Sequence, residues 1–312
     1  MAADSNTVNP DLRVGLVQMS CVEDVARNIS TADGAIRRAV TRGAQVICLP
    51  ELFATKYFCQ IEDPTHFDIA EQIPGPTTQR FSALARELGV VLIVPVFEKR
   101  AAGVYHNSAV ILDVTGEICG VYRKMHVPDD PQFHEKYYFA PGDQGYVVVD
   151  TAFARISVLI CWDQWYPEAA RLAALDGAQI IFYPTAIGWL EQETYVVRQE
   201  QQNAWRTMQR SHAIGNGVFV AAVNRIGKEA IGVDSDELEF WGHSFVCGPT
   251  GSVLAEAQGG TDEIIIADCD LEVIEEQRRH WPFLRDRRVD SYKQLSERYI
   301  DSASARSRYS KS

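Results

Sequence analysis

The sequence predicts an α/β fold built from two similar halves, with sheet packed against sheet and helices on the outside. Short apolar runs alternate with longer amphipathic runs over nearly the whole chain of 312 residues. The segment at 43–50, GAQVICLP, recurs as GAQIIFYP at 177–184. A second echo, of 114–118 in 249–253, follows in the same order at nearly the same offset. We therefore expect one domain with an internal duplication.

Composition narrows the class of protein before any motif is considered. Hydrophobic residues make up 46% of the chain and charged residues 23%, as in a soluble, well-packed protein. The net charge of -12 argues against a nucleic-acid partner, because phosphate binding needs a clustered basic face. No apolar run approaches a membrane span and no signal peptide is visible, so no membrane partner is expected.

The cysteines and histidines predict neither a metal site nor a cofactor. Seven cysteines occur without a Cys-x-x-Cys pair, which disfavours a disulfide framework or a zinc site. The seven histidines show no His-x-His or His-x-x-x-His spacing, so a metal-dependent hydrolase is disfavoured. We expect a reduced, cytoplasmic protein that uses no cofactor.

The first half opens with a strand at 13–19, followed by a helix at 24–41 whose apolar residues recur at helical spacing. A buried strand at 46–49 stops at Pro50, because proline cannot continue a sheet ladder. The remaining elements of this half are a helix at 77–88, a strand at 90–97, and antiparallel strands at 108–114 and 117–122. A long loop is expected at 126–145.

The second half begins with an apolar strand at 156–161 and a helix at 167–175, which Pro167 opens at its first position. The elements expected after it are a strand at 180–183, a helix at 200–214, strands at 218–223, 244–247, 252–256 and 263–267, and a helix at 271–280. We place the domain at 12–284, a flexible N-terminus at 1–11, and a C-terminal tail at 285–312. The tail is a candidate for the interface of a homodimer or larger homo-oligomer.

Three side chains that could take part in catalysis follow apolar strands, where α/β folds expose groups to a crevice. Glu51 comes directly after the strand at 46–49, in a half-desolvated place that raises the pKa of a carboxyl group. Lys124 follows the strand at 117–122 and opens the long loop. Taken by itself, Glu51 could also be a helix or turn cap, and Lys124 could be an ordinary surface lysine.

Cys161 ends its strand just before Pro167 begins a helix, so its thiol sits at a strand-to-helix bend. Backbone N–H groups at such a bend can hold an oxyanion. A free thiol titrates near ~8.5, so a nucleophilic cysteine needs a base and a cation close by. A buried structural cysteine is the alternative, against which the polar residues Asp163 and Gln164 count.

Glu51, Lys124 and Cys161 at three strand ends, with Pro50-Glu51 and Cys161-Trp162-Asp163, resemble the nitrilase superfamily of carbon–nitrogen hydrolases. The resemblance runs from Val14 to about Leu284. It implies a four-layer α-β-β-α sandwich with two similar halves. It also implies that Glu51 takes the thiol proton, that Lys124 and the N–H of Trp162 hold the oxyanion, and that Cys161 becomes acylated.

The same resemblance adds a fourth catalytic residue, Glu135, which follows His134 in the long loop. In the superfamily this glutamate helps to position the lysine and the attacking water. Charge alone would not have singled Glu135 out among the residues of that loop.

Finer motifs resemble those members of the superfamily that hydrolyse small cationic N-carbamoyl amines. The motifs are 126–130, 137–143, 161–165 and 184–189. Gln164 and Trp165 supply no cation for a substrate carboxylate, whereas carboxylates and aromatic faces suit an ammonium tail. The residues expected to contact substrate are Trp162, Tyr57, Asp130, Thr185 and Trp189, with Asp129, Glu191 and Glu193 as further acidic candidates.

Two alternatives stay open at this point. One is an amidohydrolase for N-carbamoyl amino acids or small amides, which a cation lining the pocket would favour. The other is a non-catalytic binding member of the fold, which the presence of all three catalytic residue types disfavours.

Overall fold

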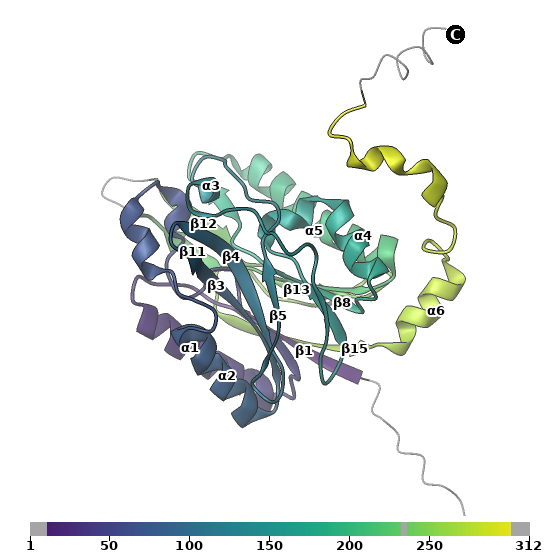
Figure 1. The fold of residues 1–312 in the computed structure, drawn as a ribbon, viewed down its shortest axis with the longest axis horizontal. Helices are drawn as coiled ribbons and strands as arrows, with labels where there is room; N and C mark the ends of the chain where they lie inside the picture. Colours follow the sequence, from purple (N-terminus) through teal and green to yellow (C-terminus); the bar gives the residue numbers. More distant parts are fainter. Residues whose placement is uncertain (1–10, 232–235, 301–312) are drawn as a thin grey trace, which may run out of the picture.

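The computed structural model describes residues 11–231 and 236–300 and shows a four-layer α-β-β-α sandwich, as predicted (Figure 1). Two six-stranded sheets pack face to face. Helices α1 (Val25–Thr41) and α2 (Pro76–Leu88) cover one outer side, and α4 (Pro167–Leu175) and α5 (Tyr195–Asn216) cover the other. Residues 1–10 of the expected N-terminal segment and 301–312 of the expected tail lie outside the described residues.

The first sheet has a parallel centre, in which β1 pairs with β2 and β2 with β3, and antiparallel edges. Its strands in spatial order are β15 (Glu263–Asp270), β1 (Asp11–Gln18), β2 (Val46–Cys48), β3 (Val91–Ala101), β4 (Val104–Leu112) and β5 (Ile118–Arg123). Val46 and Cys48 of β2 face the core between the sheets, whereas Ile47 faces the core beneath the helices. Burial on both faces explains why this strand is apolar throughout.

The second sheet repeats this plan. Its order is β14 (Val253–Glu256), β13 (Phe245–Cys247), β10 (Phe219–Val223), β8 (Ile180–Pro184), β7 (Arg155–Val158) and β6 (Val148–Asp150). The pairs β7–β8 and β8–β10 are parallel, and the outer pairs are antiparallel.

Matching hydrogen bonds at the two GAQ segments support the internal duplication. The side chain of Gln45 accepts the N–H of Arg13 at 2.9 Å, and that of Gln179 accepts the N–H of Arg155 at 2.9 Å. Gly43 (φ 87°) and its counterpart Gly177 (φ 94°) both adopt the left-handed conformation that glycine tolerates. Each half therefore turns from its helix into its second strand in the same way.

A third, smaller sheet was not predicted. It has the order β11 (Ile226–Glu229), β12 (Leu238–Trp241) and β9 (Gly188–Leu190). These strands are only three or four residues long, and 226–229 mixes Gly, Lys and Glu, so they are too short to show an apolar period. Pairing with distant segments makes them strands.

The helices differ from expectation in two places. Helix α5 begins at Tyr195 rather than at 200, and its first-turn residues Tyr195, Val196 and Val197 are exposed, which hides the helical period. A one-turn helix, α3 (Glu135–Tyr138), interrupts the predicted long loop. The helix α6 (Glu272–His280) was predicted, and short 3-10 turns complete the described chain at Phe58–Gln60, Pro64–Ile69, Cys161–Trp165, Val289–Ser291 and Lys293–Ser296. Within the described ranges, no helix is both long and apolar enough to cross a membrane.

Candidate active site

The two facing sheets bring the three predicted strand ends together. Glu51 lies three residues after β2, and Lys124 directly follows β5, both in the first sheet. Cys161 lies three residues after β7, in the second sheet. Glu135 comes from the first turn of α3.

A buried ion triad joins Lys124 to two carboxylates. The Nζ atom of Lys124 lies 2.8 Å from Oε1 of Glu51 and 2.6 Å from Oε2 of Glu135. All three side chains are at most 1% exposed. Charges this deep are tolerated only when they are paired and hydrogen-bonded, so the triad holds its members in one arrangement.

Two neutral side chains orient the carboxylates. Asn107 on β4 donates its Nδ2 to Oε1 of Glu51 at 2.7 Å and lies 3.5 Å from Oε2 of Glu135. The hydroxyl of Tyr57 donates to Oε1 of Glu135 at 2.7 Å. Tyr57, expected as a wall of the substrate pocket, instead lies fully buried behind Glu135 and does not line the cavity.

The second carboxylate oxygen of Glu51, Oε2, is buried without a hydrogen-bond partner among the described residues. Burial raises the pKa of Glu51 to about 7, although the charge of Lys124 opposes the shift. For Lys124, burial by itself lowers the pKa, but Glu135 and Glu51 outweigh it and the pKa ends well above its usual value. The site thus holds a permanent cation beside a carboxylate that exchanges its proton near neutral pH.

A fully buried arginine, Arg225, stabilises the turn that follows Glu51. Its guanidinium donates to the carbonyl oxygens of Leu52 at 3.1 Å and Thr55 at 2.8 Å, and it pairs with Glu229 at 2.6 Å. Leu52 has a φ of 50°, a strained conformation that such surrounding contacts stabilise.

Cys161 lies at a bend with left-handed backbone geometry, at a φ of 40°. Non-glycine residues adopt this conformation rarely and mainly at functional sites, because it is strained. The Sγ atom lies 3.8 Å from the carbonyl oxygen of Ala186. Burial raises the pKa of the thiol well above its usual value, Glu51 raises it further, and Lys124 opposes them. The resting thiol is therefore protonated and depends on a base.

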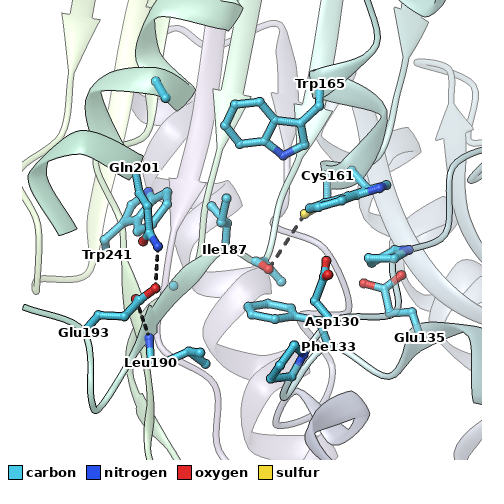
Figure 2. Close-up of a pocket in the computed structure, with 16 residues that line it drawn as sticks. Asp130, Phe133, Glu135, Cys161, Trp165, Ile187, Leu190, Glu193, Gln201 and Trp241 are labelled. Carbon is cyan, nitrogen blue, oxygen red and sulfur yellow. Dashed lines mark hydrogen bonds between the residues drawn. The ribbon is translucent and has the colours of Figure 1, made fainter. Parts of the chain in front are cut away.

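A cavity of about 530 Å³ opens onto Cys161 (Figure 2). Its lining combines aromatic faces with three carboxylates, those of Asp130, Glu135 and Glu193. The other lining residues are Pro128, Pro131, Phe133, Cys161, Trp162, Trp165, Ala186, Ile187, Gly188, Leu190, Gln201, Ala204 and Trp241. Among these described residues there is no Lys, Arg or His.

Of the residues expected to contact substrate, Trp162 and Asp130 line this cavity, and so does Glu193. Thr185 does not, because its hydroxyl is fully buried and donates to the carbonyl of Tyr183 at 2.9 Å. Trp189 also lies outside the lining, with the guanidinium of Arg198 5.4 Å from its ring centre.

The acidic candidates Asp129 and Glu191 do not line the cavity either. Asp129 is exposed and lies 3.7 Å from the ring of His134. Glu191 accepts the N–H of Glu237 at 3.4 Å on the exposed surface.

Gln164, one of the two positions considered for pairing with a substrate carboxylate, does not line the cavity. It is fully buried, and its Oε1 accepts the indole N–H of Trp205 at 2.7 Å and the amide of Gln209 at 2.8 Å, both on α5. Only Trp165 of this pair reaches the cavity. Adjacent residues in the short helical turn point in different directions, so Gln164 anchors α5 and does not contact the cavity.

Several site residues carried no signal in the sequence. Asn107 lies within a strand of mixed composition and Arg225 lies beside one. The neighbouring sequence does not indicate which distant residues they contact. Trp241 belongs to the unpredicted third sheet. Across residues 11–231 and 236–300, no cluster of three or more His, Cys, Asp or Glu side chains is arranged to hold a metal ion.

Comparison with known proteins agrees with this geometry. Residues 13–279 match the carbon–nitrogen hydrolase family. The chain is 45% identical to the N-carbamoylputrescine amidase of Solanum lycopersicum, over 90% of this chain and 94% of that protein. It is 38% identical to a citrullinase of Francisella tularensis, over 93% and 99% of the two chains.

Among solved structures, a carbon–nitrogen hydrolase from Helicobacter pylori G27 superposes with a TM-score of 0.90 at 46% identity. That match covers 93% of this chain and all of the other (100%). The prediction of the nitrilase superfamily is thus confirmed, and the chain belongs to the carbon–nitrogen hydrolase family.

Proposed function

We propose that this protein hydrolyses the ureido group of N-carbamoylputrescine to putrescine, ammonia and carbon dioxide, a step of polyamine biosynthesis. The charge of the cavity carries the choice of substrate, because its described lining has carboxylates and no cationic side chain. Glu135 is already neutralised by Lys124, which leaves Asp130 and Glu193 to meet a positive tail. The relatives named N-carbamoylputrescine amidase support the same assignment.

The chemistry uses a covalent intermediate. Oε2 of Glu51 takes the proton of Cys161 as Sγ attacks the carbamoyl carbon, and Lys124 with the N–H of Trp162 stabilises the oxyanion. The C–NH₂ bond then breaks, and Glu51 returns the proton to release ammonia. Water, activated by Glu51, hydrolyses the resulting thiocarbamate to free Cys161 and a carbamic acid, which decomposes to putrescine and carbon dioxide.

Glu193 is the group we assign to the ammonium tail. In Figure 2 it lies with Gln201 and Trp241 at the end of the cavity away from Cys161, whereas Asp130 points toward Cys161. Its carboxylate accepts the N–H of Leu190 at 2.9 Å and the amide of Gln201, and both donors are neutral. The negative charge of Glu193 is therefore oriented but not neutralised, and the ring of Trp241 adds an electron-rich face for a cation.

The test is a comparison of substrates that differ only at the tail. We expect kcat/KM to fall about a thousandfold from N-carbamoylputrescine to N-carbamoyl-γ-aminobutyrate, because a buried carboxylate beside Glu193 costs about 4 kcal/mol. Pentylurea, which replaces the ammonium by a methyl group, should lie between them. Ammonia release measures all three.

The matched variants are Glu193→Gln and Asp130→Asn. Glu193→Gln should raise KM for N-carbamoylputrescine and leave turnover of pentylurea unchanged. If Asp130→Asn had this effect and Glu193→Gln did not, the tail would bind at the other carboxylate. Equal kcat/KM for the diamine and the amino acid would overturn the diamine assignment altogether.

Hydrolysis of citrulline is the second candidate, favoured by the citrullinase relative. Citrulline is N-carbamoylputrescine with a carboxylate on the carbon that carries the ammonium. Glu193 would suit the ammonium, but no cationic side chain of the described lining would meet the carboxylate. A kcat/KM for citrulline that equals or exceeds that for N-carbamoylputrescine would favour this second reading.

Activity should depend on pH through Glu51. Because the base must be a carboxylate and its pKa is raised to about 7 by burial, kcat/KM should fall tenfold per pH unit below about 7. Asn107→Leu removes a donor that favours the charged form, so it should move this acid limb to higher pH. A limb that stays near pH 4.5 in the wild type would contradict the role of Glu51.

We also propose that the enzyme forms a homodimer or larger homo-oligomer through its C-terminal segment, in the reduced cytoplasm. After α6 the chain extends away from the sandwich (Figure 1), and large apolar side chains stay exposed there. These are Trp281, Phe283, Val289, Tyr292, Leu295, Tyr299 and Ile300. All seven cysteines are free thiols, as a reducing compartment allows.

Light scattering of the full chain should give a mass at least twice 34.9 kDa. A second copy would cover this apolar segment. The variant Leu295→Ser with Tyr299→Ser should shift the mass toward the monomer. A monomeric wild type would refute the assembly.

A further inference from the structure

Asp163 is a buried carboxylate that the proposed chemistry does not use. It is 0% exposed, and four donors surround it. Its Oδ2 accepts the N–H of Ile160 at 2.8 Å and the hydroxyl of Tyr122 at 2.7 Å. Its Oδ1 accepts the N–H of His126 at 3.0 Å and lies 2.7 Å from Nδ1 of the same residue. A carboxylate so fully satisfied is held in one orientation.

The donors lie on either side of the catalytic residues. Ile160 precedes Cys161 in the chain, and Asp163 follows it by two positions. Tyr122 and His126 lie two positions before and two after Lys124. One carboxylate therefore connects the bend that carries Cys161 to the strand end that carries Lys124.

This connection matters because Cys161 and Lys124 belong to different sheets. Lys124 follows β5 of the first sheet and Cys161 follows β7 of the second, and no strand of one sheet pairs with a strand of the other. Backbone ladders therefore do not set the distance between thiol and ammonium. Side-chain contacts between the sheets, which include the shared apolar core and the hydrogen bonds of Asp163, do so.

We propose that Asp163 is a positioning residue that sets Lys124 relative to Cys161 for oxyanion stabilisation. This inference rests on the catalytic roles assigned above. Donors in an oxyanion site act by being preorganised, and a displacement of about 1 Å can cost about a hundredfold in rate. The stacked rings of His126 and Tyr166, with centres 3.7 Å apart, brace the same connection from outside.

The experiment compares Tyr122→Phe, Asp163→Asn and their combination, with kcat and KM measured separately. Tyr122→Phe removes one donor and should lower kcat about tenfold with little change in KM. That hydroxyl also accepts the N–H of Met125 at 3.3 Å, a contact that belongs to the same strand end. Asp163→Asn should lower kcat at least about a hundredfold. The double variant should have the same kcat as Asp163→Asn alone, because both substitutions break the same connection between the two segments.

Asp33→Asn is the matched control. Asp33 is a buried carboxylate of α1 that joins Arg37 and Arg80 at the outer helices and does not line the cavity. This control should lower the melting temperature and leave kcat unchanged. Wild-type kcat in Tyr122→Phe, or effects of Tyr122→Phe and Asp163→Asn that multiply in the double variant, would overturn the proposal. The proposal would also be overturned if the loss of kcat in Asp163→Asn were explained by unfolding of the variant, as shown by a melting temperature below that of the assay.

Alkylation of Cys161 by iodoacetamide adds a readout that needs no substrate. Asp163→Asn should change this rate far less than kcat, since alkylation does not use the oxyanion donor. An equal loss of both would mean that the cysteine bend itself has collapsed, which would replace positioning by a structural role. A wild type that is alkylated at Cys161 but hydrolyses no ureido compound would refute the proposed function instead.

Discussion

Cys161→Ala is expected to abolish hydrolysis, with kcat reduced at least about 10⁴-fold, because Cys161 is the one thiol among the described residues that line the cavity. The backbone bend should persist, since alanine removes one sulfur atom whose hydrogen bond to the carbonyl oxygen of Ala186 is long, at 3.8 Å. Ammonia release from N-carbamoylputrescine measures the loss. The melting temperature of the same sample shows whether the fold remains.

Cys247→Ala is the matched control, because this thiol is also buried but lies on β13 in the core. It should keep wild-type kcat. Mass spectrometry of the wild type quenched during turnover should place a substrate adduct on Cys161 and on none of the other six cysteines. Ammonia release by Cys161→Ala would remove the nucleophile assignment.

Lys124→Met should lower kcat about 10²–10³-fold with a smaller change in KM, because the ammonium acts mainly once the oxyanion forms. It should also destabilise the fold by about 3–5 kcal/mol, since two buried carboxylates lose their partner. Lys124→Arg should not restore activity. The side chain is 0% exposed, so a larger planar group has no room and cannot replace a compact ammonium.

Stability and chemistry can be separated at this site. Adding Glu135→Gln to Lys124→Met removes one of the unpaired charges, so it should recover part of the free energy of unfolding without recovering kcat. Chemical denaturation and ammonia release measure the two quantities on one sample. Near-normal kcat in Lys124→Arg would show that the lysine does not hold the oxyanion.

Much of the architecture follows from local patterns in the sequence. The apolar run at 46–48 is buried on both faces of β2, and the repeated GAQ segment makes the same turn in both halves. Such features depend on residues close together in the chain, where periodicity and glycine conformations dominate. The positions of Glu51, Lys124 and Cys161 at strand ends were readable for the same reason.

The third sheet shows the opposite case. Strands β9, β11 and β12 have little apolar pattern of their own and form because distant segments pair. Leu190 and Trp241, which shape the tail end of the cavity, come from these strands. The shape of the pocket was therefore hidden in the sequence.

Side-chain direction was the other property that only the tertiary structure decided. Tyr57, Thr185 and Trp189 were all expected beside the substrate, yet each is held by neighbours outside the cavity. A linear sequence shows which residues are close in the chain but not which face of a turn each one occupies. By itself, the sequence determined the α/β fold class, the duplication and the three strand-end residues. The tertiary structure then placed the one-turn helix α3, and with it Glu135, against Lys124. Packing of one sheet against the other brought Asp163 to Tyr122 and His126, because a linear sequence does not show which strand ends meet in space.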